Sequence, residues 1–180
     1  MPGKADEAVL KIGWAQADIT PEEPVAITGQ FHARISEGVR DPITATTLVM
    51  DSDAEAVIFV SCDLVAIGEA LREAVMERLP ADGAGRAALI MNATHSHTAP
   101  ETRTERFVTA GRDYGVDLPV MPATEYVQFA ADRIAEAINC AWEKRSRGSV
   151  AFGLGQAVVG RNRRWVNLDG LGDVSVLRQL

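Results

Sequence analysis

The hydrophobic residues in the first third of the chain fall in short runs, a pattern that is typical of strands. One apolar element covers residues 9–14, and two predicted strands cover residues 45–50 and 56–61. The polar segment 51–55 between these two strands predicts a hairpin with a five-residue loop. Residues 21–41 combine proline, glycine and charges of both signs, and we expect them to form a long irregular loop.

Two helices are predicted where apolar residues recur at helical spacing. The first covers residues 67–79, in which an apolar residue recurs at every fourth position, and Pro80 ends it. The second covers residues 123–144, with one continuous apolar face and with Pro122 suited to its first turn. Between the two helices, residues 87–91 form a short apolar run that predicts a buried strand.

The remaining segments complete the predicted fold. Short strands are expected at residues 149–152, 156–159 and 174–177. Residues 98–118 are polar and lack periodicity, so we expect a long mobile loop of the kind that often has a function. The order of these elements predicts an α/β layered domain with a mixed β-sheet and two main helices, and a single domain over residues 1–180.

Composition and charge narrow the class of protein. The 180 residues are enough for one compact domain, and 47% hydrophobic with 24% charged residues is ordinary for a globular protein. A net charge of -7 without a long basic block argues against nucleic acid as a partner. No apolar run approaches the roughly 18 residues of a membrane span, so we expect a cytoplasmic protein. Cys62 and Cys140 are interpreted as small buried thiols.

Two of the three histidines lie two residues apart, directly after the predicted strand 87–91. Because side chains at positions i and i+2 of an extended segment share a face, His95 and His97 are expected to point at one spot. Imidazole nitrogens bind zinc well, and the ends of strands are common places for such sites. Thr94, Ser96 and Thr98 are candidates for holding the two rings through hydrogen bonds. The pair therefore predicts a metal or catalytic site, with a chance pairing on an exposed turn as the alternative.

Three further segments hold candidate site residues. Asp63 follows a predicted strand and is either the N-cap of the next helix or an active-site group near the histidines. His32 is a candidate for lining the site, or is simply an exposed loop residue. The basic segment 161–164 suits fixing a substrate carbonyl or hydroxyl, and a solvated turn is the alternative.

These segments together resemble the N-terminal part of the neutral/alkaline non-lysosomal ceramidase family. The most specific stretch is Asn92-Ala-Thr-His-Ser-His-Thr-Ala-Pro100, which is similar to the family's Ala-Thr-His-Thr-His-Ser-Gly-Pro. Four other stretches match in the same order along the chain, at residues 13–21, 30–50, 57–67 and 160–163.

The resemblance implies roles for individual residues. His95 would be a zinc ligand, and His97 would help bind substrate or stabilise the oxyanion, or share the metal as a second ligand. Asn162 and Arg163 match an Asn-Arg near the family's substrate, while Asp63 and His32 would lie around the site. The implied reaction is cleavage of the amide of an N-acyl, lipid-like substrate, in which Zn²⁺ polarises the carbonyl and a serine attacks it.

The chain departs from the family pattern near its end. The second zinc histidine, the nucleophilic serine, and the glutamate and tyrosine ligands would all follow Leu180. We therefore expect a truncated N-terminal portion of a ceramidase-like catalytic domain. Such a portion would expose surface that the missing part covers, and self-association is one way to bury that surface. Three functions stay open: a zinc-dependent amidohydrolase with a partly encoded site, an inactive remnant or binding module, and a hydrolase with a self-contained metal site. The last would be built from His32, His95, His97 and Asp63, since three protein ligands and a water suffice for catalytic zinc.

Overall fold

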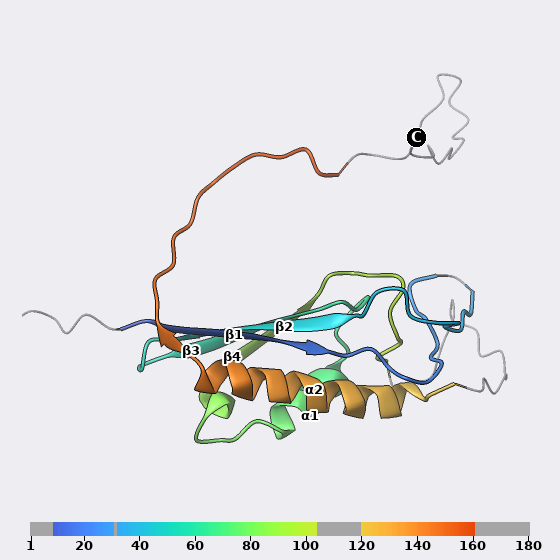
Figure 1. Cartoon of the computed structure of the whole chain (residues 1–180), viewed down its shortest axis with the longest axis horizontal. Helices are drawn as coiled ribbons and strands as arrows, with labels where there is room; N and C mark the ends of the chain where they lie inside the picture. Colours follow the sequence, from blue (N-terminus) through green and yellow to red (C-terminus); the bar gives the residue numbers. More distant parts are fainter. Residues whose placement is uncertain (1–8, 31, 104–119, 161–180) are drawn as a thin grey trace, which may run out of the picture. The chain divides into compact units, whose positions relative to one another are not determined.

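The computed structural model describes residues 9–30, 32–103 and 120–160. The chain divides into two units at the boundary between Ser149 and Val150. All helices and strands of the described residues lie in the first unit (Figure 1). No helix of the described residues is long and apolar enough to cross a lipid bilayer.

The described part of the second unit differs from the prediction. Residues 150–160 contain neither helix nor strand, so the strands predicted at residues 149–152 and 156–159 are wrong for this structure. Alternating apolar residues form a strand only when a neighbouring strand pairs with their backbone hydrogen-bonding groups. Among the described residues, no strand pairs with residues 150–160. The strand predicted at residues 174–177 lies outside the described residues.

The first unit is built on a five-stranded sheet with the strand order β4-β3-β2-β1-β5. Strands β3 and β4 pair in parallel and the other neighbours pair antiparallel, which confirms the predicted mixed α/β sheet. The strands are β1 (Lys11–Asp18), β2 (Thr44–Asp51), β3 (Ala56–Cys62), β4 (Ala88–Ala93) and β5 (Ser146–Arg147).

Strands β2 and β3 form the predicted hairpin. Asp51 pairs with Ala56, which leaves a four-residue loop instead of the expected five. The turn is closed by the backbone of Ser52, whose N–H donates to the carbonyl of Glu55 at 2.9 Å. The apolar element predicted at residues 9–14 overlaps the first half of β1, which begins at Lys11 and continues to Asp18.

Both predicted helices are present and cover one face of the sheet (Figure 1). They are α1 (Glu69–Glu77) and α2 (Ala123–Glu143), with a short 3-10 helix, η1 (Ala84–Arg86), between them in sequence. Helix α1 is shorter than predicted because it starts after Gly68, which is its N-cap. Leu71 and Val75, from the predicted apolar face, are fully buried.

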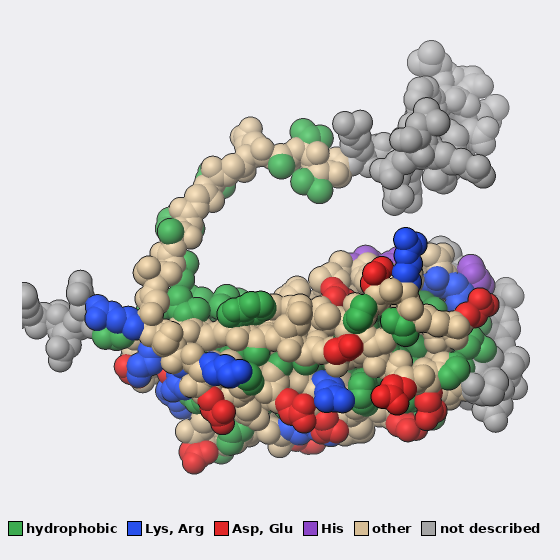
Figure 2. Space-filling model, viewed as in Figure 1, with side chains coloured by type: hydrophobic (Ala, Val, Ile, Leu, Met, Phe, Trp, Pro, Cys, Tyr) green, Lys and Arg blue, Asp and Glu red, His purple; other side chains and the backbone are tan. Residues whose placement is uncertain are grey.

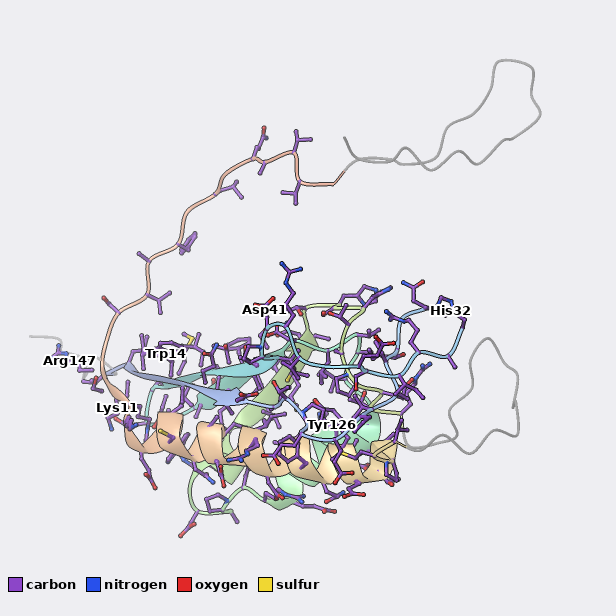
Figure 3. The ribbon with its side chains drawn as sticks, turned by 45° about the vertical axis from the view of Figure 1, so that its right-hand side comes forward. Lys11, Trp14, His32, Asp41, Tyr126 and Arg147 are labelled. Atoms are coloured by element: carbon purple, nitrogen blue, oxygen red, sulfur yellow. The ribbon has the colours of Figure 1, made fainter. Side chains whose placement is uncertain are left out.

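The hydrophobic core lies between the sheet and the two helices. Tyr126 of α2 is fully buried there, and its hydroxyl donates to the carbonyl of Ile19 at 3.0 Å (Figure 3). Gly13 of β1 allows the end of α2 to approach the sheet. A Cβ atom at this position would lie 2.0 Å from the carbonyl oxygen of Ala141, so any side chain would push the helix away.

Among the described residues of the first unit, no helix covers the opposite face of the sheet. Its central row is apolar and in register across four strands: Trp14, Leu48, Phe59 and Ile90. The next row toward the ends of β3 and β4 is polar: Gln16, Thr46, Ser61 and Asn92. Trp14 is 65% exposed, and acidic and basic side chains gather instead over the helices, in the lower part of Figure 2.

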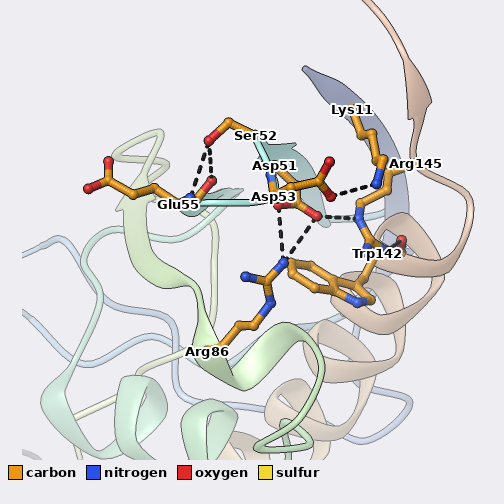
Figure 4. A network of polar contacts seen from close by, with 8 residues as sticks. All are labelled: Lys11, Asp51, Ser52, Asp53, Glu55, Arg86, Trp142 and Arg145. Atoms are coloured by element: carbon orange, nitrogen blue, oxygen red, sulfur yellow. Dashed lines mark hydrogen bonds and ion pairs between the residues drawn. The ribbon is translucent and has the colours of Figure 1, made fainter. Parts of the chain in front are cut away.

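A buried ion cluster closes the end of the sheet at which β2 ends (Figure 4). The Asp51 side chain is fully buried and accepts hydrogen bonds from Nε of Arg145 at 2.8 Å and from Nη2 of Arg86 at 3.1 Å. Both guanidinium groups also lie over the ring of Trp142, at 4.0 and 5.0 Å. Burial opposes ionisation of Asp51, but the bonds from Arg145 and from the backbone of Asp53, with the charges of both arginines, outweigh it. The pKa of Asp51 therefore lies below its usual range.

Candidate metal centre

The histidine pair lies at the other end of the sheet, just beyond β3 and β4. The two segments stay paired past their last strand residues. The N–H of Thr94 donates to the carbonyl of Cys62 at 2.9 Å, and that of Ser96 donates to Leu64 at 3.1 Å. The backbone that carries the histidines is therefore fixed to the end of the buried strand β3.

The two imidazole rings converge, as the sequence predicts. Nε2 of His95 lies 3.2 Å from Nε2 of His97, and the ring centroids are 4.8 Å apart with an angle of 72° between the planes. The predicted reason is wrong, however. Strand β4 ends at Ala93, and His95 has a φ of 66°, in the left-handed region, so the segment is not extended. A tight turn brings the rings together.

Hydrogen bonding sets the protonation of the neutral His95 ring. Its Nδ1 lies 2.8 Å from the carbonyl oxygen of Val65, which can only accept, so Nδ1 carries the proton. Nε2 of His95 is then unprotonated, and its lone pair accepts a hydrogen bond from Nε2 of His97. Fixing one ring nitrogen on a backbone carbonyl while the other is available is the usual arrangement of a metal-binding histidine.

The His97 ring packs against the irregular loop that precedes β2. A Cβ atom on Gly29 would lie 2.6 Å from Cγ of His97, so the ring lies directly on the glycine backbone. Nη2 of Arg34 donates to the carbonyl oxygens of His97, at 2.5 Å, and of Thr28, at 3.0 Å. The sequence pattern does not connect Gly29 or Arg34 with His97, because both lie more than 60 positions away from it.

Asp63 joins the ends of three strands. Its carboxylate accepts hydrogen bonds from the backbone N–H and the hydroxyl of Thr44, at 3.0 and 2.9 Å, and from the hydroxyl of Thr94 at 3.2 Å. The N-cap interpretation is wrong, because Gly68 is the N-cap of α1 and receives no side-chain bond. Asp63 instead holds the residue that precedes His95.

The neighbouring hydroxyl groups differ from the prediction. Thr94 bonds to Asp63, and the hydroxyls of Ser96 and Thr98 lie 3.1 Å from each other. These three side chains therefore stabilise the turn, while the rings themselves are held by Val65 and by Gly29.

Residues 99–102, which follow the histidine turn, are buried. Glu101 is 5% exposed, and its carboxylate accepts hydrogen bonds from the backbone of Thr102 and from the backbone and side chain of Arg103. Burial opposes its ionisation, but the bonds from Arg103 outweigh it and hold the pKa of Glu101 below its usual range. The beginning of the predicted loop 98–118 is thus packed, and residues 104–119 lie outside the described residues.

A cavity of about 490 Å³ opens beside the histidine turn. Thr98 and Pro100 line it on one side, and residues from the irregular loop, including Val25, Ile27 and Val39, line it on the other. Charged side chains, among them Glu22, Glu37 and Arg40, share the lining with the apolar ones. Sites for small molecules likewise combine apolar walls with polar groups.

The other predicted site residues are not brought to the pair. His32 is exposed, and no hydrogen bond joins it to another described side chain; Figure 3 shows it in the loop at the end of the unit far from Lys11. Within residues 9–30, 32–103 and 120–160, no three His, Cys, Asp or Glu side chains lie close enough to hold a metal ion. The self-contained site of His32, His95, His97 and Asp63 is therefore not formed. Asn162 and Arg163 lie outside the described residues.

Comparison with solved structures identifies the fold. The neutral ceramidase from Pseudomonas aeruginosa matches with a TM-score of 0.62 and 22% identity, over 79% of this chain and 23% of that chain. A ceramidase complexed with C2 matches with a TM-score of 0.61 and 21% identity, over 79% of this chain and 22% of that one. The chain thus spans less than a quarter of the length of either protein.

Sequence comparison identifies the family. No curated protein matches the chain. The family described as neutral/alkaline non-lysosomal ceramidase, N-terminal, matches residues 10–164. This match covers most of the sequence and includes the histidine pair, and the chain therefore belongs to the neutral/alkaline non-lysosomal ceramidase family.

Proposed function

We propose that this chain provides the histidine-bearing part of a zinc-dependent amidohydrolase site that cleaves an N-acyl amide. The observation that carries the proposal is the contact of His95 and His97 through their Nε2 atoms, with Nδ1 of His95 fixed on Val65. Family membership supports a ceramide-type substrate.

The spacing of the two nitrogens fits a zinc ion. Two imidazole ligands at about 2.05 Å from a tetrahedral zinc are about 3.3 Å apart. The Nε2 atoms of His95 and His97 are 3.2 Å apart. His95 would bind the ion through its unprotonated Nε2, and His97 would do so in the tautomer that carries its proton on Nδ1. Both residues therefore fit the metal without a large movement.

The chain's own residues would bind and orient the substrate. Bound zinc would polarise the carbonyl of the scissile amide. The apolar side of the cavity next to Thr98 and Pro100 suits the acyl chain of an N-acyl substrate. A His97 that keeps its Nε2 proton donates a hydrogen bond toward the carbonyl oxygen, which is the role that the resemblance implies. Asn162 and Arg163 are proposed as further substrate contacts.

No third His, Cys, Asp or Glu of the described residues lies close enough to complete the three protein ligands that catalytic zinc usually has. We therefore expect weaker zinc binding and slower turnover than a complete site would give. Because the chain spans 23% of the ceramidase from Pseudomonas aeruginosa, the further groups of the reaction are proposed to come from polypeptide outside the described residues.

Zinc analysis and an activity assay on the 180-residue chain test the proposal together. Dialysis against Zn²⁺ should leave one zinc per chain in the wild type and none in His95→Asn, since asparagine tolerates the left-handed backbone of this position. His32→Asn is the matched control and should keep the zinc. Zinc-dependent release of fatty acid from an N-acyl sphingosine that is lost in His95→Asn would support the enzyme, and a chain without zinc would contradict it.

A non-catalytic binding module is the second candidate function. It is favoured by the absence of a third metal ligand among the described residues. The same assay separates the two functions. Zinc bound at His95 with no hydrolysis of any N-acyl amide would favour the binding module for this chain on its own.

Self-association is proposed as part of this function. The apolar row of Trp14, Leu48, Phe59 and Ile90 lies on an open sheet face, and such faces usually pack against protein. Sedimentation velocity should show a dimer that the variant Leu48→Lys converts to monomer. A monomeric wild type would contradict this part and leave the zinc site untouched.

A further inference from the structure

The two histidine rings are held by different means. The His95 ring is fixed by a hydrogen bond from its Nδ1 to the carbonyl of Val65. Among the described residues, the only hydrogen bond of the His97 ring is its contact with His95. The orientation of the His97 ring must therefore come from packing and from its backbone.

Gly29 supplies the packing. The glycine has a φ of 98°, which strongly favours a residue without a side chain. A Cβ atom there would lie 2.6 Å from Cγ and 2.8 Å from Nδ1 of His97. The Gly29 backbone thus lies against the ring edge opposite to Nε2, and it blocks movement of the ring toward that side.

Arg34 supplies the backbone anchor. A single guanidinium nitrogen, Nη2, donates to the carbonyl of His97 at 2.5 Å and to the carbonyl of Thr28 at 3.0 Å. Thr28 directly precedes Gly29 in the chain. Arg34 therefore ties the histidine turn and the glycine to the same point.

A second arginine, Arg103, also binds the residue that precedes Gly29. Nη2 of Arg103 donates to the hydroxyl of Thr28 at 3.2 Å, and Arg103 is itself bound to the buried Glu101. The N–H of Thr28 also donates to the carbonyl of Ala99 at 3.2 Å. With its backbone and side chain both bound, Thr28 gives Gly29 a fixed place beside His97.

We infer that Gly29 and Arg34 are positioning residues that hold the His97 ring against Nε2 of His95 and thereby preset the nitrogen pair for a metal ion. The inference rests on the proposed function in its use of zinc. The ring contact itself exists without metal and can be measured separately. Neither residue is expected to touch the substrate or the metal.

Zinc affinity measured by competition with a chromophoric chelator tests the inference on the full chain. Gly29→Ala and Arg34→Met should each weaken zinc binding roughly 10- to 100-fold, the range found when groups that orient metal ligands are removed. Arg34→Lys should lose less, because it keeps the charge and donors but not the planar fork of arginine. Gly38→Ala is the matched control, since a Cβ atom there meets nothing within 4 Å, and it should bind zinc as the wild type does.

Proton NMR of the zinc-free chain gives an independent reading. The nuclear Overhauser effect between the ring protons of His95 and His97 should be present in the wild type and in Gly38→Ala, and lost in Gly29→Ala and Arg34→Met. A contact that persists in both variants, with zinc affinity within about twofold of the wild type, would overturn the inference and leave the proposed function standing. A wild type that binds no zinc would overturn the proposed function, and the ring contact would still decide the inference. Because Arg34→Met leaves the φ of Gly29 unstrained, it keeps the test valid if Gly29→Ala fails to fold.

Discussion

The buried carboxylate of Asp51 and the exposed ring of His95 lie at opposite ends of the same sheet. Asp51 has no exposed side-chain surface, and its oxygens accept bonds from Arg86 and Arg145 and from the backbone of Asp53. His95 is exposed, and its Nε2 meets one partner, the ring of His97. The polar groups of Asp51 are bonded within the folded chain, whereas the paired rings of His95 and His97 lie where an outside group can reach them.

This difference separates residues that stabilise the fold, such as Asp51, from residues that are proposed to bind metal, such as His95. A buried charge without its partners is costly, so changes at the Asp51 end should appear in the free energy of unfolding. A solvated ring at the end of a strand contributes little to folding, so changes at His95 should appear in metal binding.

The largest expected effect is on the Asp51 end. Asp51→Asn should lower the free energy of unfolding by roughly 3 kcal/mol, because two arginines lose the charge that they surround. Asp53→Asn is the matched control: its side chain is 60% exposed in an ion pair with Lys11, and it should change stability by less than about 0.5 kcal/mol. Urea unfolding measures both. Equal losses in the two variants would contradict the contrast between the ends.

Asp51 should also make the free energy of unfolding depend on pH. The pKa of Asp51 is lower in the folded chain than in the unfolded chain, so between the two values the unfolded state binds more protons and stability rises with pH. The stabilisation by Asp51 is therefore complete above the unfolded value of about 3.9 and is lost as pH falls through the folded pKa. The difference in unfolding free energy between wild type and Asp51→Asn should be constant from pH 7 to about pH 5 and shrink below about pH 4. A difference that grows on acidification would contradict this sign.

Cysteine labelling tests whether the strand end that carries the histidine turn keeps the thiol of Cys62 buried. Cys62 ends β3, and burial, together with the charge of Asp63, raises the pKa of its thiol to about 12. In the native chain at pH 8, iodoacetamide should therefore modify Cys62 roughly 100-fold or more slowly than the partly exposed Cys140. Mass spectrometry of the labelled peptides gives the two rates. Labelling of both thiols at one rate would mean that the strand end opens readily.

The smallest expected effect on stability is at the histidine itself. His95→Asn keeps a residue type that tolerates the left-handed backbone, and it should change the free energy of unfolding by about 0.5 kcal/mol or less. Urea unfolding of the zinc-free chain measures this. A loss comparable to that of Asp51→Asn would show that His95 has a structural role and would remove the contrast between the two ends.

Local patterns explain why much of the fold is predictable from the sequence. The hairpin of β2 and β3 and the helix α2 follow from the spacing of apolar residues within each segment. Strand β5 has two residues and no pattern of its own, so only its pairing with β1 defines it. Residues 150–160 show the converse, because they have a strand-like pattern and no strand.

The candidate site is predictable in its residues but not in its geometry. The spacing of His95 and His97 points to a shared site, yet the left-handed φ of His95 is what brings the rings together. The partners of Asp51 lie 35 and 94 positions away in sequence, so nothing near Asp51 marks it as buried. The contact of Gly29 with His97 likewise exists only after the chain has folded.

The nitrogen-15 chemical shifts of the histidine rings test the central claim most directly, because they report which ring nitrogen carries the proton and which binds metal. In the zinc-free chain we predict that His95 is protonated at Nδ1, on the carbonyl of Val65, with a free Nε2. Addition of one equivalent of Zn²⁺ should shift the Nε2 resonance of His95 and leave both nitrogens of His32 unchanged. A His95 ring protonated at Nε2 in the zinc-free chain, or a spectrum unchanged by zinc, would contradict the assignment of this pair as a metal centre.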